Sequence, residues 1–153
     1  VALKPIFFFF FNGRCSKCME IFDRYPNFYE PLRAWFEAFQ MSHPEAHISC
    51  AGRGYEEQEA LFQRRASRAH YAQSAHNYGA AIDVWENTGN ASDIYEKTWF
   101  REVLKPRLVD WLEWYGEVGS KFPELPHVEV KNWKAMAKRK TLKLVETDPE
   151  DEE

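Results

Sequence analysis

The sequence lacks any apolar run that approaches the roughly 18 residues needed by a membrane-spanning helix. It also lacks an excess of positive charge, with 20 Lys and Arg against 24 Asp and Glu and a formal net charge of −4. A general nucleic-acid-binding protein has a basic footprint, so that class is disfavoured. We expect neither a membrane span nor a nucleic-acid partner.

Cysteine is scarce, and the odd number of three does not suggest a disulfide framework. Cys15 and Cys18 have the C-x-x-C spacing of a zinc knuckle or a redox pair. A structural zinc site needs four ligands, and Cys50 could be the third. The fourth would come from one of three histidines, His43, His47 or His70. Ordinary reduced thiols are the competing interpretation and the one that we favour.

A Gly/Ser-rich linker and internal repeats are also absent, so the 153 residues fit one domain. We expect this domain to span residues 1–145 as a monomer, and the acidic residues 146–153 to form a disordered tail. The apolar run at residues 6–11, which includes Phe7–Phe11, is too short for the hydrophobic region of a signal peptide. We predict a buried strand there and synthesis in the cytoplasm.

Aromatic residues are abundant, at 16% of the chain, and supply material for a core. Apolar residues at helical spacing predict helices over residues 32–39, 55–69, 99–104 and 108–115. Gly116 could cap the last of these, and residues 87–90 are typical of a turn. Shorter or alternating apolar patterns predict strands at residues 47–50, 80–85 and 127–130. The sequence therefore predicts an α+β domain with a small, mostly antiparallel sheet.

The apolar segment AAIDVW, residues 80–85, contains a carboxylate, and burial of an unpaired charge there costs free energy. Asp83 there needs a cation as partner, either an Arg, a Lys or a metal. It ends the string S-x-H-x-x-G-x-A-x-D, which begins at Ser74 and contains His76 and Gly79. Further on, E-x-x-H places Glu124 three residues before His127. The ordered combination of these motifs is far more specific than either one alone.

These motifs resemble the zinc peptidases that cut D-amino-acid-containing peptides of bacterial cell walls. That family includes D-Ala-D-Ala dipeptidases and carboxypeptidases and the L-alanyl-D-glutamate endopeptidases of phage endolysins, and it shares its fold with hedgehog signalling domains. The resemblance covers about residues 47–130. It implies zinc held by His76, Asp83 and His127, with Glu124 as the catalytic base. It also implies that Arg53 and Ser74 bind the substrate.

The residue types suit that chemistry. Two imidazoles and one carboxylate are a typical catalytic zinc set, with a fourth position left for water. An Arg offers a permanently charged fork to a carboxylate. Glu129 shares a strand face with His127 and competes with Glu124 for the role of base, but a supporting role beside a ligand fits it better.

Simpler interpretations remain for single residues. His76 and Asp83 could form a hydrogen-bonded pair without a metal. Arg53 could pair with Glu56 or Glu57 at the start of a helix. Ser74 could be a turn residue.

The favoured function is hydrolysis of peptidoglycan stem peptides by an endolysin-like L-alanyl-D-glutamate endopeptidase, acting at the bacterial cell wall after release from the cytoplasm. A D-Ala-D-Ala carboxypeptidase or dipeptidase is the alternative within the enzyme class. Outside that class, the chain could be a zinc-containing binding module without catalysis, or a component of a bacteriophage particle.

Overall fold

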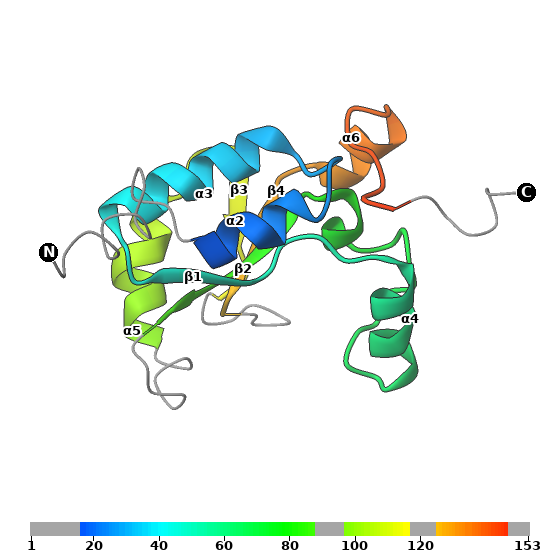
Figure 1. Ribbon diagram of the computed structural model, residues 1–153, viewed down its shortest axis with the longest axis horizontal. Coiled ribbons are helices and arrows are strands. Elements are labelled where there is room, and N and C mark those ends of the chain that lie inside the picture. Colours follow the sequence, from blue (N-terminus) through cyan, green and yellow to red (C-terminus); the bar gives the residue numbers. More distant parts are fainter. Residues whose placement is uncertain (1–15, 88–96, 117–124, 147–153) are drawn as a thin grey trace, which may run out of the picture.

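The computed structural model describes residues 16–87, 97–116 and 125–146, and it has the predicted α+β architecture (Figure 1). Its centre is a four-stranded antiparallel sheet in the order β1-β2-β4-β3. The strands are β1 (Ala46–Cys50), β2 (Ala81–Glu86), β3 (Leu112–Trp114) and β4 (His127–Val130). The expected strands at residues 47–50, 80–85 and 127–130 are confirmed to within a residue.

Helices α2 (Ser16–Asp23) and α3 (Glu30–Ser42) pack beside the sheet against β1. α3 contains the predicted helix and begins with Pro31 in its first turn, where a proline costs no hydrogen bond. Its buried residues Leu32, Phe36 and Phe39 join aliphatic side chains of the sheet in one core. Outside a bulge in β1, the strands alternate between apolar side chains that enter this core and side chains on the other face.

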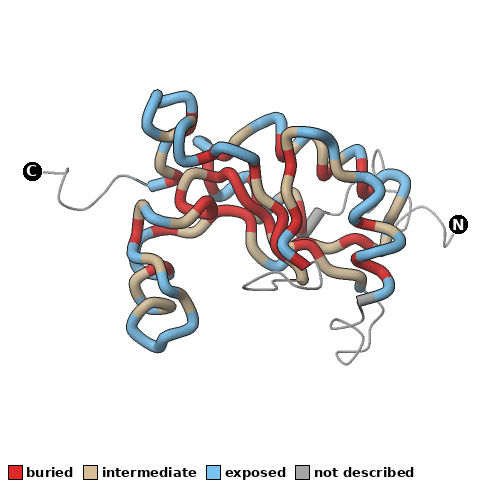
Figure 2. Tube along the Cα trace, turned by 180° about the vertical axis from the view of Figure 1, so that it is seen from behind, coloured by how far each residue is buried: buried red, intermediate tan, exposed pale blue. Residues whose placement is uncertain are grey.

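The aliphatic side chains of the sheet are completely or almost completely buried. They are Ile48, Ile82, Val84, Val128 and Val130. Figure 2 shows the buried segments gathered along the strands and the inner sides of the helices. The core therefore lies on one face of the sheet, and polar side chains at the intervening positions are left on the other.

α4 (Tyr55–Gln63) begins where expected but ends six residues before the predicted end at residue 69. Arg65, just beyond it, has φ 59°, a left-handed conformation that an α-helix does not contain. Ala, Glu and Arg residues favour a helix through this segment, but side chains of α4 bind the chain that follows in a non-helical conformation. The side-chain amide of Gln58 donates to the Ala69 carbonyl, and the backbone amide of Tyr71 donates to the Glu59 carboxylate.

The prediction of a helix over residues 108–115, capped by Gly116, is wrong. Residues 112–114 form β3, an edge strand that pairs with β4. Leu112 and Trp114 are both buried while Glu113 between them is only half-buried, so the residues follow a period of two. The burial of Trp114 and pairing with β4 outweigh the helical spacing of Leu108, Trp111, Leu112 and Tyr115.

The expected helix at residues 99–104 is present with a changing helical pitch. It comprises α5 (Lys97–Trp99), the π-helical η4 (Phe100–Leu104) and the 3₁₀-helical η5 (Lys105–Arg107). Pro106 lies in the first turn of η5, and the chain becomes extended at Leu108. A proline has no backbone N–H to continue an α-helix, so its presence here accompanies the change of pitch.

The C-terminal part of the chain packs against the domain. It contains α6 (Trp133–Lys138), which the sequence did not predict, and two buried side chains beyond it, Leu142 and Val145. The Val145 amide donates to the Asn77 carbonyl at 2.7 Å, and the Tyr55 amide donates to the Glu146 carboxylate. The segment after α6 is therefore hydrogen-bonded to the start of α4 and to the short helix that contains Asn77.

Several predictions fall outside the described residues: the strand at residues 6–11, Cys15, most of the turn at residues 87–90, Glu124, and the tail beyond Glu146. Among the residues that are described, no helix is long and apolar enough to cross a membrane.

Candidate metal centre

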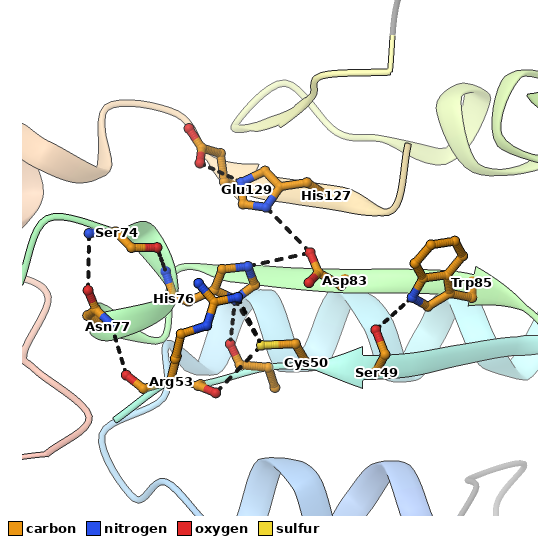
Figure 3. Close-up of polar contacts among 12 residues, drawn as sticks. Ser49, Cys50, Arg53, Ser74, His76, Asn77, Asp83, Trp85, His127 and Glu129 are labelled. Atoms are coloured by element: carbon orange, nitrogen blue, oxygen red, sulfur yellow. Dashed lines mark hydrogen bonds and ion pairs between the residues drawn. The ribbon is translucent and has the colours of Figure 1, made fainter. Parts of the chain in front are cut away.

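The sheet register brings two of the predicted metal ligands together. β2 and β4 pair so that Asp83 lies directly opposite His127 on the polar face. His76 reaches the same point from η2 (Ala75–Tyr78), the short 3₁₀ helix that leads into β2. The Asp83 Oδ1 atom lies 3.4 Å from His76 Nε2 and 3.4 Å from His127 Nδ1. Figure 3 shows both rings directed at this carboxylate.

Local sequence fixes where His76 stands. Ser74 caps η2: its hydroxyl accepts a hydrogen bond from the His76 amide, and the Asn77 side chain accepts from the Ser74 amide. Gly79 ends the helix with φ 60°, and a Cβ atom there would lie 2.7 Å from Phe28 Cα. Only glycine fits such a left-handed, crowded position without strain, so Gly79 permits the tight turn from His76 into β2.

Each imidazole is also held by its second nitrogen. His76 Nδ1 lies 3.1 Å from the Ala51 carbonyl oxygen, which can only accept, so this nitrogen carries the proton. His127 Nε2 lies 2.7 Å from the Glu129 carboxylate. Histidines that bind metals are oriented in this way, by a carbonyl or carboxylate on the far side of the ring. The nitrogens left as ligands are the two that face Asp83.

The Glu129 side chain is held by Tyr115, the residue that follows β3. The Tyr115 hydroxyl lies 2.8 Å from Glu129 Oε1 and 2.9 Å from Glu113 Oε2. Burial and these two carboxylates raise the pKa of the Tyr115 hydroxyl, so Tyr115 remains a hydrogen-bond donor. A chain of contacts thus runs from Tyr115 through Glu129 to the His127 ring.

Cys50 is a fourth polar group at the centre that the motifs did not indicate. It pairs with Asp83 across β1 and β2, and Ser49 is the extra residue of a β-bulge between Ile48 and Cys50. A bulge changes the alternation of a strand, so both Ser49 and Cys50 join the polar face. The Ser49 hydroxyl accepts from the Trp85 indole at 2.6 Å, and Cys50 Sγ lies 3.5 Å from His76 Nδ1.

One ligand atom each of Cys50, His76 and Asp83 lie within 4.8 Å of one another, so these residues could hold a metal ion. His76 and Asp83 therefore belong to two overlapping donor sets, one completed by Cys50 and the other by His127. The contact of His76 Nδ1 with the Ala51 carbonyl favours the second set, because it leaves Nε2 as the free nitrogen. This group is not the cysteine site that we considered as an alternative to reduced thiols. Cys18 is buried in α2 beside Gln40, and among the described residues it joins no group that could hold a metal.

The charges of the cluster are strongly coupled. Burial opposes protonation of His76, but Cys50 and Asp83 outweigh it and raise the pKa of His76 to about 10. Burial likewise opposes a raised pKa at His127, but Asp83 and Glu129 raise it. Burial favours the neutral acid at Asp83, yet hydrogen bonds from the two histidines hold its pKa far below the usual range. The site therefore concentrates negative charge that favours a cation, whether two protons or a divalent metal ion.

Arg53 lies beside this cluster. Its guanidinium donates to Gln58 Oε1 at 3.1 Å and contacts Cys50 Sγ at 3.7 Å. Its Nε atom is buried and has no hydrogen-bond partner in the part of the chain that the structure describes. Across those same residues it forms no ion pair with Glu56 or Glu57, which was the simpler interpretation of its position. An unused buried donor beside the candidate centre is consistent with an acceptor supplied by a ligand.

The predicted site residues thus have three outcomes. The structure brings His76, Asp83 and His127 together, with Arg53 nearby. Ser74 has a structural task as the cap of η2, and its predicted contact with substrate is not tested. Glu124 lies outside the described residues, so its role as a base stays a prediction.

The sequence contains only a weak indication that Cys50 lies at the candidate centre. Its strand was predicted correctly, yet strict alternation from Ile48 places Cys50 on the apolar face. A bulge depends on pairing with β2 and is not visible in five residues of one strand. Glu129 was singled out for a supporting role, and its contact with His127 matches that interpretation.

No model of a known protein family matches the chain, and no curated protein matches it in sequence. Among solved structures, the chain is similar to the crystal structure of the Serratia marcescens L-Ala D-Glu endopeptidase ChiX. The TM-score is 0.60 at 14% sequence identity, over 78% of this chain and 90% of that one. At this identity the similarity shows a shared fold, a helical layer beside a small antiparallel sheet.

Proposed function

We propose that this chain is a zinc-dependent peptidase that cleaves peptidoglycan stem peptides, and that the bond it cuts joins L-Ala to D-Glu. One observation carries the proposal: His76 Nε2 and His127 Nδ1 both face the same oxygen of Asp83. Two imidazoles and a carboxylate are the donor set of catalytic zinc. The similarity to an L-Ala D-Glu endopeptidase structure supports the choice of substrate.

The donor atoms fit a zinc ion better than a magnesium or calcium ion, since those two prefer oxygen ligands. Zinc bound there would polarise the scissile carbonyl and lower the pKa of a water from about 15.7 to near 7. His76 and His127 would hold the ion through Nε2 and Nδ1, with the Ala51 carbonyl and Glu129 keeping both rings in place. Asp83 would supply the negative charge that makes the site selective for a cation.

The remaining groups would handle the substrate. Glu124 would take a proton from the attacking water and pass it to the leaving amine, as a general base and then a general acid. Arg53 would bind a carboxylate or carbonyl of the stem peptide through its planar guanidinium. Ser74 would contact the substrate from the start of η2, in addition to capping that helix.

Digestion of purified sacculi, followed by mass spectrometry of the released fragments, tests the function. We expect new L-Ala carboxyl termini and new D-Glu amino termini, and no release in the presence of a chelator. Release of single D-Ala residues would overturn the choice of bond and favour a carboxypeptidase. Retention of sacculi without any cleavage would favour a binding module.

A matched pair of variants tests the mechanism. Glu124→Ala should lower the rate by about 10²–10⁴-fold, the usual contribution of a positioned acid–base group. Glu102→Ala, an exposed carboxylate on η4, serves as the control and should retain the full rate. An unchanged rate in Glu124→Ala would show that another group is the base, and Glu129 would then be the next candidate.

A further inference from the structure

The most basic part of this acidic protein is the segment that contains α6. Residues 131–143 read KNWKAMAKRKTLK and contain no acidic residue. The cations are Lys131, Lys134, Lys138, Arg139, Lys140 and Lys143, and all of them are exposed. Because the whole chain has a net charge of −4, this segment is a local positive surface on a negative background.

Two of these lysines line a pocket. The pocket has a volume of about 480 Å³, within the usual range for a small-ligand site. Lys134 and Lys138 stand one helical turn apart on its wall, and Tyr78 and Trp133 supply an aromatic floor with ring centroids 5.7 Å apart. Ala72, Gln73 and Ala137 complete the lining.

The aromatic floor is held in place. The Tyr78 hydroxyl donates to the Ala72 carbonyl at 3.2 Å, and Ala72 itself has φ 69°, an unusual conformation for alanine. Lys134 Nζ lies 5.7 Å from the Trp133 ring centroid, within reach of a cation–π contact. In the described part of the chain, neither Lys134 nor Lys138 forms an ion pair with a carboxylate. Their charges remain for a ligand.

The pocket is joined to the candidate metal centre by two short connections. Tyr78 lies two residues after His76 on the same 3₁₀ helix, and Trp133 lies three residues after the end of β4, which presents His127. α6 and η2 are in contact. The pocket and the candidate centre therefore share η2, which contributes Tyr78 to one and His76 to the other.

We propose that this pocket binds the C-terminal carboxylate of the stem peptide whose internal bond is cut at the metal centre. The inference rests on the proposed function, and it adds a second anion-binding point besides Arg53. Two lysines match the charge of a carboxylate, and the aromatic floor matches the apolar body of a D-Ala residue. A membrane surface is disfavoured because Trp133, Met136 and Ala137, the larger part of the apolar surface of α6, pack in or against the core.

The test uses the zinc-loaded full chain and the tetrapeptide L-Ala-D-Glu-L-Lys-D-Ala, with the C-terminal carboxyl group either free or amidated. In the wild type, amidation should raise KM roughly twofold to fivefold and leave kcat unchanged. The double variant Lys134→Gln/Lys138→Gln should show the higher KM with both peptides. The control Lys140→Gln/Lys143→Gln removes the same charge outside the pocket and should still distinguish the peptides.

Binding, measured apart from turnover, separates this inference from the proposed function. The probe is the same pair of peptides with the L-Ala–D-Glu amide N-methylated to prevent cleavage, and the readout is calorimetric. Preference for the free acid in the wild type and its loss in Lys134→Gln/Lys138→Gln support the inference, even if no peptide is cleaved. Cleavage without any such preference overturns the inference and leaves the function intact. An equal loss in the Lys140→Gln/Lys143→Gln control shows general electrostatic attraction, such as that of a phosphate-rich wall polymer, and also overturns it.

Discussion

The two faces of the central sheet are built on opposite principles. One face is aliphatic and completely buried, and its residues need only be apolar and of suitable size. The other face carries Asp83, His127 and Glu129, whose positions depend on individual hydrogen bonds. The aliphatic face therefore contributes mainly to the stability of the domain, and the polar face carries the candidate metal centre. Substitutions on the first face should lower the free energy of unfolding, and substitutions on the second should reduce zinc binding.

The largest separation is expected at Asp83. Asp83→Ala removes the negative centre of the cluster and leaves two buried imidazoles with no shared partner. We expect loss of zinc binding and of peptidase activity to the background level, with the fold retained because Asp83 is not part of the apolar core. Mass spectrometry measures the metal content, and circular dichroism shows whether the fold is retained. Retained stoichiometric zinc in Asp83→Ala would show that Asp83 is not a ligand.

Ile82→Ala, one residue earlier, is the opposite case. Ile82 is completely buried on the aliphatic face, and its truncation should lower the free energy of unfolding by about 2–5 kcal/mol. The folded fraction should still bind zinc with wild-type stoichiometry. Denaturant unfolding and zinc titration measure the two quantities on one sample. A variant with unchanged stability but lost metal would reverse the assignment of the two faces.

Much of this division can be predicted from one sequence. Alternation in AAIDVW and HVEV gives both the strands and their aliphatic faces, because burial on one side has a period of two. The placement of His76 could be expected as well, since the glycine at position 79 permits a turn that only a few backbones make. The Ser49 bulge and the edge strand β3 could not, because both are decided by pairing with strands distant in sequence.

The C-terminal segment was missed for a related reason. Lys-rich composition in residues 138–143 indicates solvated chain, and it does so correctly for the charged side chains. Leu142 and Val145 are buried because this segment packs against distant parts of the chain: the Val145 amide donates to the Asn77 carbonyl, and the Asn27 side chain donates to the Leu144 carbonyl. No local pattern encodes these contacts. Sequence reasoning therefore predicted most of the sheet and the three residues that meet at the candidate centre. It missed the contacts between this C-terminal segment and parts of the chain that are distant in sequence.

A substitution of Glu129 tests whether residues that contact the candidate ligands also contribute to zinc affinity. Glu129→Gln keeps the shape of the side chain and weakens its hold on the His127 ring. We expect zinc affinity to fall by about 10–100-fold, the usual effect of removing an outer partner of a metal-binding histidine. Competition with a chromogenic chelator measures the affinity. Glu113→Gln, which contacts only Tyr115 among these groups, serves as the control and should change the affinity less.

The pH dependence of stability should differ between the metal-free and the zinc-bound chain. In the metal-free chain, the raised pKa of His76, about 10, contributes stability that is complete below the unfolded value near 6.5. That contribution is lost as the pH rises through about 10. Zinc competes with the same protons, so its stabilising effect should grow over this range. Thermal unfolding between pH 6.5 and 10, with zinc and with chelator, should show a widening difference, and parallel curves would contradict the coupling.

The smallest effect is expected at Cys50. If zinc is held through His76 Nε2, then Cys50→Ala should change the zinc affinity by less than about tenfold. Cobalt substitution gives a second readout, because a thiolate ligand produces an intense near-ultraviolet charge-transfer band that nitrogen and oxygen ligands lack. A strong band in the wild type that disappears in Cys50→Ala would place the metal in the alternative set of Cys50, His76 and Asp83.

The fastening of the final described residues onto η2 and α4 limits how the gene can be shortened. The Val145 amide and the Glu146 carboxylate hold the two segments that carry His76 and Arg53. A stop codon placed before residue 142 would therefore remove the contacts that support the candidate metal centre, although every motif residue would still be encoded. Expression tags and fusion partners belong after position 146, where they leave both anchors undisturbed.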